Sequence, residues 1–153
     1  MKFKNRMERQ EVVEMLLGQL GLSTTKLGFL YLSVLITLAW QDKETSTQPF
    51  QIYGNQLAKE ANIFSGHIYA NMKYAIEEAW FLGDFKLLEA IFGYSLMSLV
   101  TEEPSPNKFV HGIVNFLLAL ERNDTDVMAF LKFVEQDGTL LHSISSWGEE
   151  RDD

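Results

Sequence analysis

An uncharged and mostly apolar run of 15 residues, Leu27–Gln41, leaves this chain few ways to fold. The run is shorter than the roughly 20 residues that a helix needs to cross a bilayer. Ser23, Thr24 and Thr25 lie just before it, and residues of these types cap helix N-termini well. We therefore expect a buried central helix that ends near Trp40, and no membrane-spanning segment.

Length and composition favour a single domain in a reducing compartment. A chain of 153 residues with 46% hydrophobic residues is long enough to bury a core. The absence of cysteine excludes disulfides, thiolate zinc sites and a cysteine nucleophile. The N-terminus mixes lysine and arginine with glutamate, unlike a signal or transit peptide. We expect a cytoplasmic protein.

Helical periodicity continues on both sides of the central run, and strand signals are scarce. Glycine, proline and cap-forming residues separate the periodic segments, and residues 42–51 are expected to form a loop. The sequence therefore predicts an all-α fold, a compact bundle of about six to seven helices that contains a helix-turn-helix. Besides the central run, the expected helices are 8–20, 55–61, 65–81, 85–92, 108–122 and 127–136.

Two parts are expected along the chain. Residues 1–122 form the main helical domain, with the helix-turn-helix at 55–81, and residues 123–153 add a C-terminal helix and an acidic tail packed on the same domain. In the second part, Phe130, Phe133 and Trp147 are candidates either for an oligomer surface or for simple packing. The other large aromatic residues are expected in the core: Phe29, Tyr31, Trp40, Trp80, Phe92 and Phe116.

The turn chemistry supports the predicted helix-turn-helix. Leu57, Ala58 and Ala61 are expected to face inward from its first helix, and the small Ala58 lets the second helix approach closely. Asn62 tolerates the positive φ that the tight turn requires. Ser65 is expected to cap the second helix by accepting a backbone hydrogen bond.

The second helix of this motif has two faces at helical spacing, and the outward one carries little positive charge. An ordinary helical hairpin has the same pattern, so periodicity alone leaves both DNA binding and simple packing open. The inward stripe is Ile68, Met72, Ala75, Ile76, Ala79 and Trp80, and the outward face is Gly66, His67, Ala70, Lys73, Tyr74 and Glu77, with Tyr69 at its border.

The net charge of −8 argues against indiscriminate DNA binding, because an acidic surface repels phosphate. Its distribution weakens this objection. Residues 1–110 hold 10 lysines or arginines and 12 aspartates or glutamates, whereas residues 111–153 hold 3 and 9. The acidity therefore belongs mainly to the C-terminal part.

No catalytic or metal-binding constellation is evident. His67, His111 and His142 are scattered, without partners at metal-ligand spacing. Asp124 and Asp126 match the start of a capped helix better than a calcium loop. Phosphate-loop, nucleophile-elbow and dinucleotide motifs are absent. We expect no enzyme activity, no catalytic residue, no metal or other cofactor and no small-molecule substrate.

From about residue 16 to residue 118, the chain resembles the C-terminal effector domain of the stage-zero sporulation response regulator, the master regulator of endospore formation. The order and spacing of the matching residues run through the whole domain. The landmarks are Leu20-Gly21, Gly28-Phe29-Leu30-Tyr31-Leu32, Ile52-Tyr53, Ala58-Lys59, Asn62, Ala75-Ile76-Glu77-Glu78-Ala79-Trp80, Gly83-Asp84, Ile91-Phe92-Gly93-Tyr94, Pro106-Asn107 and Phe109-Val110.

The resemblance implies an all-α effector domain of about six helices that binds double-stranded DNA. In that family the second helix of the helix-turn-helix enters the major groove, and the domain binds tandem DNA boxes as a head-to-tail dimer. The family's regulators carry a phosphorylated receiver domain before the effector. Only about fifteen residues precede the match here, so we expect no receiver domain.

The reading helix departs from the family pattern, since the family presents arginines to guanine where this chain has His67, Tyr69, Ala70 and Lys73. The DNA-contacting set expected here is Ser65, His67, Tyr69, Ala70, Lys73 and Tyr74. The first hypothesis is a cytoplasmic DNA-binding transcription regulator, as a homodimer or as a heterodimer with a related regulator. The alternative is a receiver-less protein-interaction module, impaired in DNA binding, that modulates a sporulation regulator or another partner.

Overall fold

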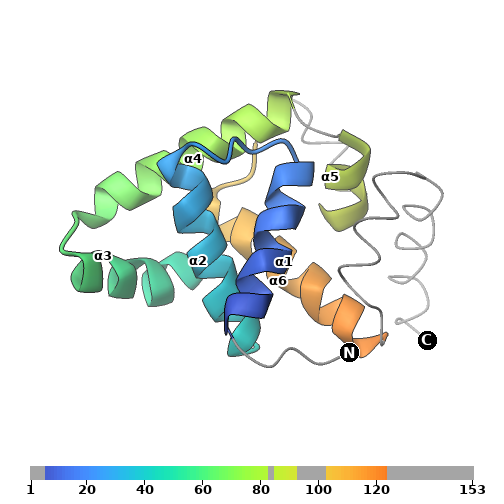
Figure 1. Cartoon of the computed structure of the whole chain (residues 1–153), viewed down its shortest axis with the longest axis horizontal. Coiled ribbons are helices and arrows are strands. Elements are labelled where there is room, and N and C mark those ends of the chain that lie inside the picture. The colour runs from blue at the N-terminus through green and yellow to red at the C-terminus, as the bar shows by residue number, and fades with distance from the viewer. Residues whose placement is uncertain (1–5, 83–84, 93–102, 124–153) are drawn as a thin grey trace.

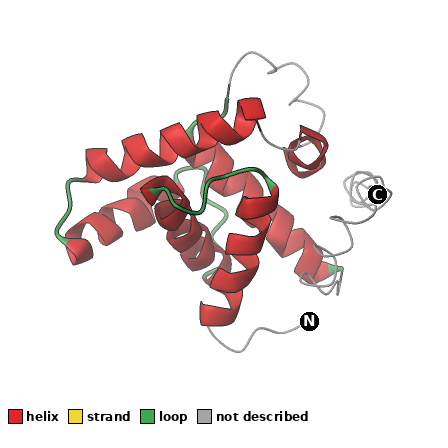
Figure 2. Ribbon diagram, turned by 45° about the horizontal axis from the view of Figure 1, so that its top comes forward, coloured by secondary structure: helices red, strands yellow, loops and turns green. Residues whose placement is uncertain are grey.

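The described residues form helices and the loops between them (Figures 1 and 2). The structure, a computed structural model, describes residues 6–82, 85–92 and 103–123. The expected all-α fold is confirmed, since no strand occurs in these ranges. The elements are α1 (Arg6–Gln19), α2 (Leu27–Gln41), the π-helical turn η1 (Phe50–Gly54), α3 (Asn55–Ala61), α4 (Ser65–Leu82), α5 (Phe85–Phe92) and α6 (Pro106–Arg122).

The centre of the molecule is α2, as the uncharged run predicts. It packs against α1, α4 and α6, so that it has protein on several sides. Its two buried hydroxyls are satisfied within the helix: Ser33 Oγ donates to the Leu30 carbonyl at 2.9 Å, and Thr37 Oγ1 donates to the Ser33 carbonyl at 2.6 Å. None of the helices that the structure describes is long and apolar enough to cross a membrane.

The end of α1 follows the sequence pattern, although the helix begins two residues earlier than expected. Gly21 has a φ of 98°, in the left-handed region that glycine adopts without penalty. The Leu22 N–H then donates to the Leu17 carbonyl at 3.1 Å, which closes the helix end. The apolar side of α1 is buried in the core: Val12, Val13, Leu16 and Leu17, followed by Leu20.

Aromatic side chains connect the helices within this core. The guanidinium of Arg9 on α1 lies 5.3 Å from the centre of the Trp40 ring, and the Trp40 indole N–H donates to Glu121 on α6. Three elements, α1, α2 and α6, therefore meet at one indole. The aromatic residues expected in the core are buried, except that Phe92 is partly buried and packs against it: Phe29, Tyr31, Trp40, Trp80 and Phe116.

The loop expected at 42–51 is shorter in the structure, because η1 occupies its end and runs directly into α3. Long-range hydrogen bonds hold this turn. The Phe50 N–H donates to Asn107 Oδ1 at 2.7 Å, and Asn107 Nδ2 donates to Gln51 Oε1 at 3.0 Å. Their partner lies at the start of α6, which local sequence patterns cannot reveal.

The helix expected at 108–122 begins at Pro106 instead. Ser105 is its N-cap and accepts a hydrogen bond from the Lys108 N–H at 3.3 Å. Proline suits the first helical position, because the N–H that it lacks has no partner there. The predicted helix 127–136, the C-terminal part at 123–153 and Phe130, Phe133 and Trp147 lie outside the described residues, apart from Asn123.

Candidate nucleic-acid interface

The turn between α3 and α4 has the predicted geometry. Asn62 has φ 54° and ψ 48°, in the left-handed region. The Ile63 N–H donates to the Ala58 carbonyl at 2.9 Å, and the Asn62 N–H donates to the Lys59 carbonyl at 3.4 Å. These two bonds satisfy carbonyls at the end of α3 and reverse the chain within three residues.

The inward side of α3 is smaller than expected. Ala58 is buried and Leu57 is half-buried against the core, but Ala61 is exposed, so its predicted inward position is wrong. The helix has only seven residues, and Ala61 is its last. The chain turns away at Asn62, which leaves Ala61 on the solvent side of the bend.

The start of α4 also differs in detail from the prediction. The helix begins at Ser65, and the His67 N–H donates to the Phe64 carbonyl at 3.0 Å. Ser65 is half-buried, and within the described ranges its hydroxyl makes no hydrogen bond to the helix backbone. The cap role expected for Ser65 is therefore not seen.

The inward stripe of α4 is buried as the periodicity predicts. It packs mainly against α2, and the two helices lie close together at Gly28. A Cβ atom on Gly28 would stand 2.2 Å from the backbone oxygen of Asn71 and 2.7 Å from the Ala75 Cβ. The residues of the stripe are Ile68, Met72, Ala75, Ile76, Ala79 and Trp80.

The outward face of α4 is open to solvent, and the helix runs along an edge of the molecule in both ribbon views (Figures 1 and 2). His67, Lys73 and Tyr74 are exposed, with Tyr74 at 65% of its full accessibility. Ser65, Tyr69 and Ala70 are half-buried. All six residues predicted to contact DNA therefore keep accessible surface on this one helix.

The His67 side chain is held by two neighbours. Asn71 Nδ2 lies 3.3 Å from His67 Nδ1 and donates to the His67 carbonyl at 2.8 Å. The Tyr31 ring meets the imidazole edge to face, with 6.0 Å between ring centres. Because the amide nitrogen donates, this contact is a hydrogen bond in the tautomer in which Nδ1 accepts and Nε2 carries the proton. His67 thus presents an N–H donor from a fixed ring.

Tyr69 is partly engaged in packing. Its ring lies against Phe50 of η1 in an edge-to-face arrangement, with 5.2 Å between ring centres. This contact connects α4 to η1 and to the start of α6 beyond it. Tyr69 therefore has two roles. It helps to fix the position of α4, and it lies at the border of the outward face.

Phe64 is a large exposed residue in the turn between α3 and α4, and it is not among the DNA-contacting residues predicted from the sequence. It retains 79% of its accessibility. Its ring covers the first turn of α4, because a Cβ atom on Gly66 would stand 2.5 Å from Phe64 Cε1. The sequence pattern that could have revealed this arrangement is a bulky aromatic residue in the turn, Phe64, followed two positions later by a glycine, Gly66. Any other side chain at position 66 would occupy the space of the Phe64 ring.

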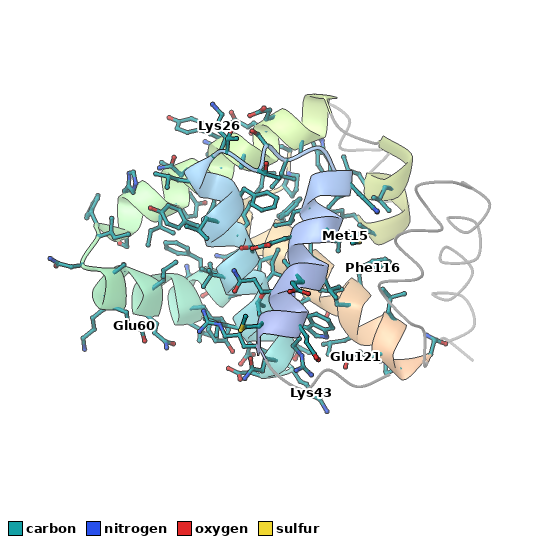
Figure 3. The ribbon with its side chains drawn as sticks, in the orientation of Figure 1. Met15, Lys26, Lys43, Glu60, Phe116 and Glu121 are labelled. Atoms are coloured by element: carbon teal, nitrogen blue, oxygen red, sulfur yellow. The ribbon has the colours of Figure 1, made fainter. Side chains whose placement is uncertain are left out.

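The charges around the motif are mixed. Lys59 on α3 and Lys73 on α4 are exposed, and so is Glu60, which extends from the end of α3 (Figure 3). Glu77 and Glu78, further along α4, are half-buried. The motif therefore has cations near both its helices but no strongly basic surface.

A separate groove of about 690 Å³ lies beside α1 and the start of α2. Its polar edge includes two carboxylates, Glu11 and Glu14, and one cation, Lys26, so its net charge does not favour phosphate. Leu27 and Leu30 also line it, and they are 48% and 47% exposed. This groove is a different kind of surface from the outward face of α4.

Within the described ranges, no group of three or more histidine, aspartate and glutamate side chains could hold a metal ion. His111 is used elsewhere, since its Nδ1 lies 3.1 Å from the Ser46 carbonyl.

A comparison with known protein families finds a match over most of this fold. Residues 13–117 match the family described as Sporulation initiation factor Spo0A C terminal. The match starts within α1, ends within α6 and contains the whole of α3 and α4.

Proposed function

Because this chain belongs to the Spo0A C-terminal family of sporulation initiation factors, a family of DNA-binding effector domains, we propose that it regulates transcription by placing α4 in the major groove of DNA. The observation that carries this proposal is the division of α4 into two faces. One face is locked into the core, and the other offers its side chains to solvent. A groove-reading helix needs both properties.

The proposed contacts divide by chemistry. Lys73, and Lys59 on the neighbouring helix, bind phosphates, and backbone N–H groups at the Ser65 end of α4 hold a phosphate oxygen. His67 donates to a base edge from Nε2, and Tyr74 contributes its hydroxyl or its ring. Ala70 and Tyr69 lie against bases or sugars between these groups.

The test begins with selection of a duplex from a random-sequence pool at low salt, followed by anisotropy titrations. Lys73→Ala should weaken binding and reduce the slope of log K against log salt by about 0.9, because one fewer counterion is released. Arg122→Ala is the matched control. It also removes one exposed cation, but from the end of α6 next to Glu121, away from α3 and α4 (Figure 3).

Two results would contradict the proposal. If no duplex is retained at low salt, the chain is not a DNA-binding regulator. If Lys73→Ala and Arg122→Ala change the affinity and the salt slope equally, DNA is bound but α4 is not its contact helix.

A second candidate function is a protein-interaction module that modulates a related regulator. The observation that favours it is the groove lined by Leu27 and Leu30, where exposed apolar side chains stand beside carboxylates. Purification of the tagged full chain from its host distinguishes the two. Recovery of a stoichiometric protein partner that is lost on Leu30→Asp, with no duplex retained, would favour the interaction module.

A further inference from the structure

The outward face of α4 and the turn before it hold two large, exposed aromatic side chains. Phe64 is 79% exposed and Tyr74 is 65% exposed, and Ala70 lies half-buried between them along the chain. Gly66 adds no side chain, and its place is covered by the Phe64 ring. Lys73 is the one cation on the outward face.

We propose that this surface reads thymine methyl groups, so that the DNA box it selects is defined by A·T pairs at the contacted positions. The inference rests on the proposed function, because it specifies the substrate of the same face. Phe64, Ala70 and Tyr74 would contact the methyl groups, and His67 would donate to an adjacent acceptor.

The chemistry of the major groove favours thymine for these side chains. Thymine alone presents a C5 methyl group there, together with the O4 acceptor, and alanine and phenylalanine side chains make apolar contacts with that methyl group. With Nδ1 accepting from the Asn71 amide, His67 has an Nε2–H donor that suits an acceptor such as O4. Guanine is best recognised by a bidentate guanidinium, and no arginine lies between Ser65 and Leu82.

The dimensions fit a short box. Gly66 and Tyr74 are eight residues apart on α4, which corresponds to roughly 12 Å along a helix axis. Base pairs are spaced about 3.4 Å apart, so this length covers three to four of them. Phe64 at one end and Tyr74 at the other would thus contact different base pairs.

The glycine at position 66 keeps the Phe64 ring in place. With an alanine there, the Cβ atom would stand 2.5 Å from Phe64 Cε1 and 3.0 Å from Phe64 Cζ, so the ring would have to move. Gly66→Ala is therefore a way to displace Phe64 without deleting it. Because the ring is largely exposed, moving it leaves the core intact.

The experiment uses the duplex enriched from the random pool by the full chain, and a second duplex with deoxyuridine in place of every thymine of the contacted box. This replacement removes only the methyl groups. We expect the dissociation constant to rise about fourfold for each contacted methyl, the ratio that corresponds to burial of one methylene-sized group. The same replacement outside the protected box is the DNA control.

Variants identify the contacting side chains. Phe64→Ala and Gly66→Ala should each weaken binding to the thymine duplex. When deoxyuridine replaces only the thymine that Phe64 contacts, the ratio of the dissociation constant of the deoxyuridine duplex to that of the thymine duplex should fall toward one in both variants. Met7→Ala is the protein control, because Met7 is also an exposed apolar residue but lies at the start of α1. It should leave the ratio unchanged.

The outcomes separate this inference from the proposed function. If the selected duplex binds equally well with deoxyuridine, or if selection yields a box without thymine, methyl readout is wrong while DNA binding stands. If no duplex is retained at low salt, the proposed function fails and methyl readout fails with it.

Discussion

Individual residues with a positive φ end three of the helices. Gly21 after α1 has a φ of 98°, Lys43 after α2 has a φ of 53° and Asn62 after α3 has a φ of 54°. In each case the next N–H donates to a carbonyl five residues back, at 3.1, 2.8 and 2.9 Å. At Asn62 this geometry also sets the angle at which α4 leaves α3, so the residue has a role in the candidate interface.

Asn62→Val should lower the free energy of unfolding by about 1–2 kcal/mol, because a β-branched residue pays a steric penalty in the left-handed region. Urea denaturation monitored by circular dichroism measures the change. Asn62→Gly is the control and should be close to neutral, since glycine has no Cβ to clash. Equal destabilisation by both variants would show that the asparagine side chain, and not the backbone conformation, is what matters.

Tyr53 in η1 is hydrogen-bonded to Asp42 at the end of α2, across the loop that joins the two elements. Its ring is 5% exposed, and its hydroxyl donates to Asp42 Oδ2 at 2.8 Å. Burial raises the pKa of Tyr53 above its usual value of about 10, and the hydrogen bond to Asp42 raises it further. The folded chain therefore keeps this proton at a pH where the unfolded chain loses it.

The pH dependence follows from the direction of this shift. Above about pH 10 the unfolded chain binds fewer protons at Tyr53 than the folded chain does. The stability that Tyr53 contributes is therefore complete below that pH and decreases as the pH rises. The free energy of unfolding falls by at most about 1.4 kcal/mol per pH unit. Thermal denaturation between pH 8 and 11 should show a shallower decline for Tyr53→Phe than for the native chain. If stability falls equally with pH in the native chain and in Tyr53→Phe, the proton held by Tyr53 does not cause the decline.

At the scale of elements, the crossing of α2 and α4 decides where the outward face points. Gly28 lets the backbone of α4 approach at Asn71, and the same Asn71 side chain holds His67 in place. The contact of α4 with the core at Asn71 and the candidate DNA-contacting residue His67 are therefore only four residues apart on α4. A change in the crossing would alter both.

Gly28→Ala should destabilise the protein by about 1–3 kcal/mol, because its Cβ would stand 2.2 Å from the Asn71 backbone oxygen and the helices would have to separate. Chemical denaturation gives the stability, and anisotropy with the selected duplex should show weaker binding under conditions where the variant is fully folded.

Gly18→Ala is the matched control for this prediction. Gly18 lies in α1, and apart from the neighbouring backbone of its own helix nothing lies within 4 Å of the place where its Cβ would stand. Alanine there should stabilise the protein by up to about 0.5–1 kcal/mol through the higher helix propensity of alanine. If Gly28→Ala is stabilising as well, close approach of α2 and α4 is not what requires glycine.

At the scale of the whole molecule, the charge distribution opposes the proposed activity. The net charge is −8, and residues 111–153 contribute 9 acidic against 3 basic side chains. Lys59 and Lys73 lie on the helix-turn-helix, which also carries Glu60, Glu77 and Glu78. Long-range repulsion of DNA should therefore be appreciable at low salt and screened at high salt, where the Debye length is short.

Replacing Glu149, Glu150, Asp152 and Asp153 with their amides should tighten DNA binding several-fold at low salt, because four negative charges are removed. The gain should shrink as salt increases. Anisotropy titrations at several salt concentrations measure both effects. A gain that is independent of salt would mean that these carboxylates act through a specific contact instead of through the general field.

Several features follow from local patterns alone. The uncharged run predicts the end of α2 to within one residue. The helical spacing of apolar and polar residues predicts the two faces of α4. The positive φ that the tight turn requires predicts the left-handed conformation of Asn62. These predictions succeed because helix periodicity and backbone sterics depend on residues that are neighbours in the sequence. The family assignment is likewise readable from the order of short local motifs.

Other features depend on residues that are distant in the sequence. The π-helical turn η1 needs Asn107 from α6, Gly28 matters only because α4 crosses α2 there, and the Phe64 ring is placed by packing over Gly66. The exposure of Ala61 depends on how the turn directs the chain. Periodicity assigns a residue to one side of its helix, but only the packing of several helices decides how close two backbones come and which side chains keep contact with solvent.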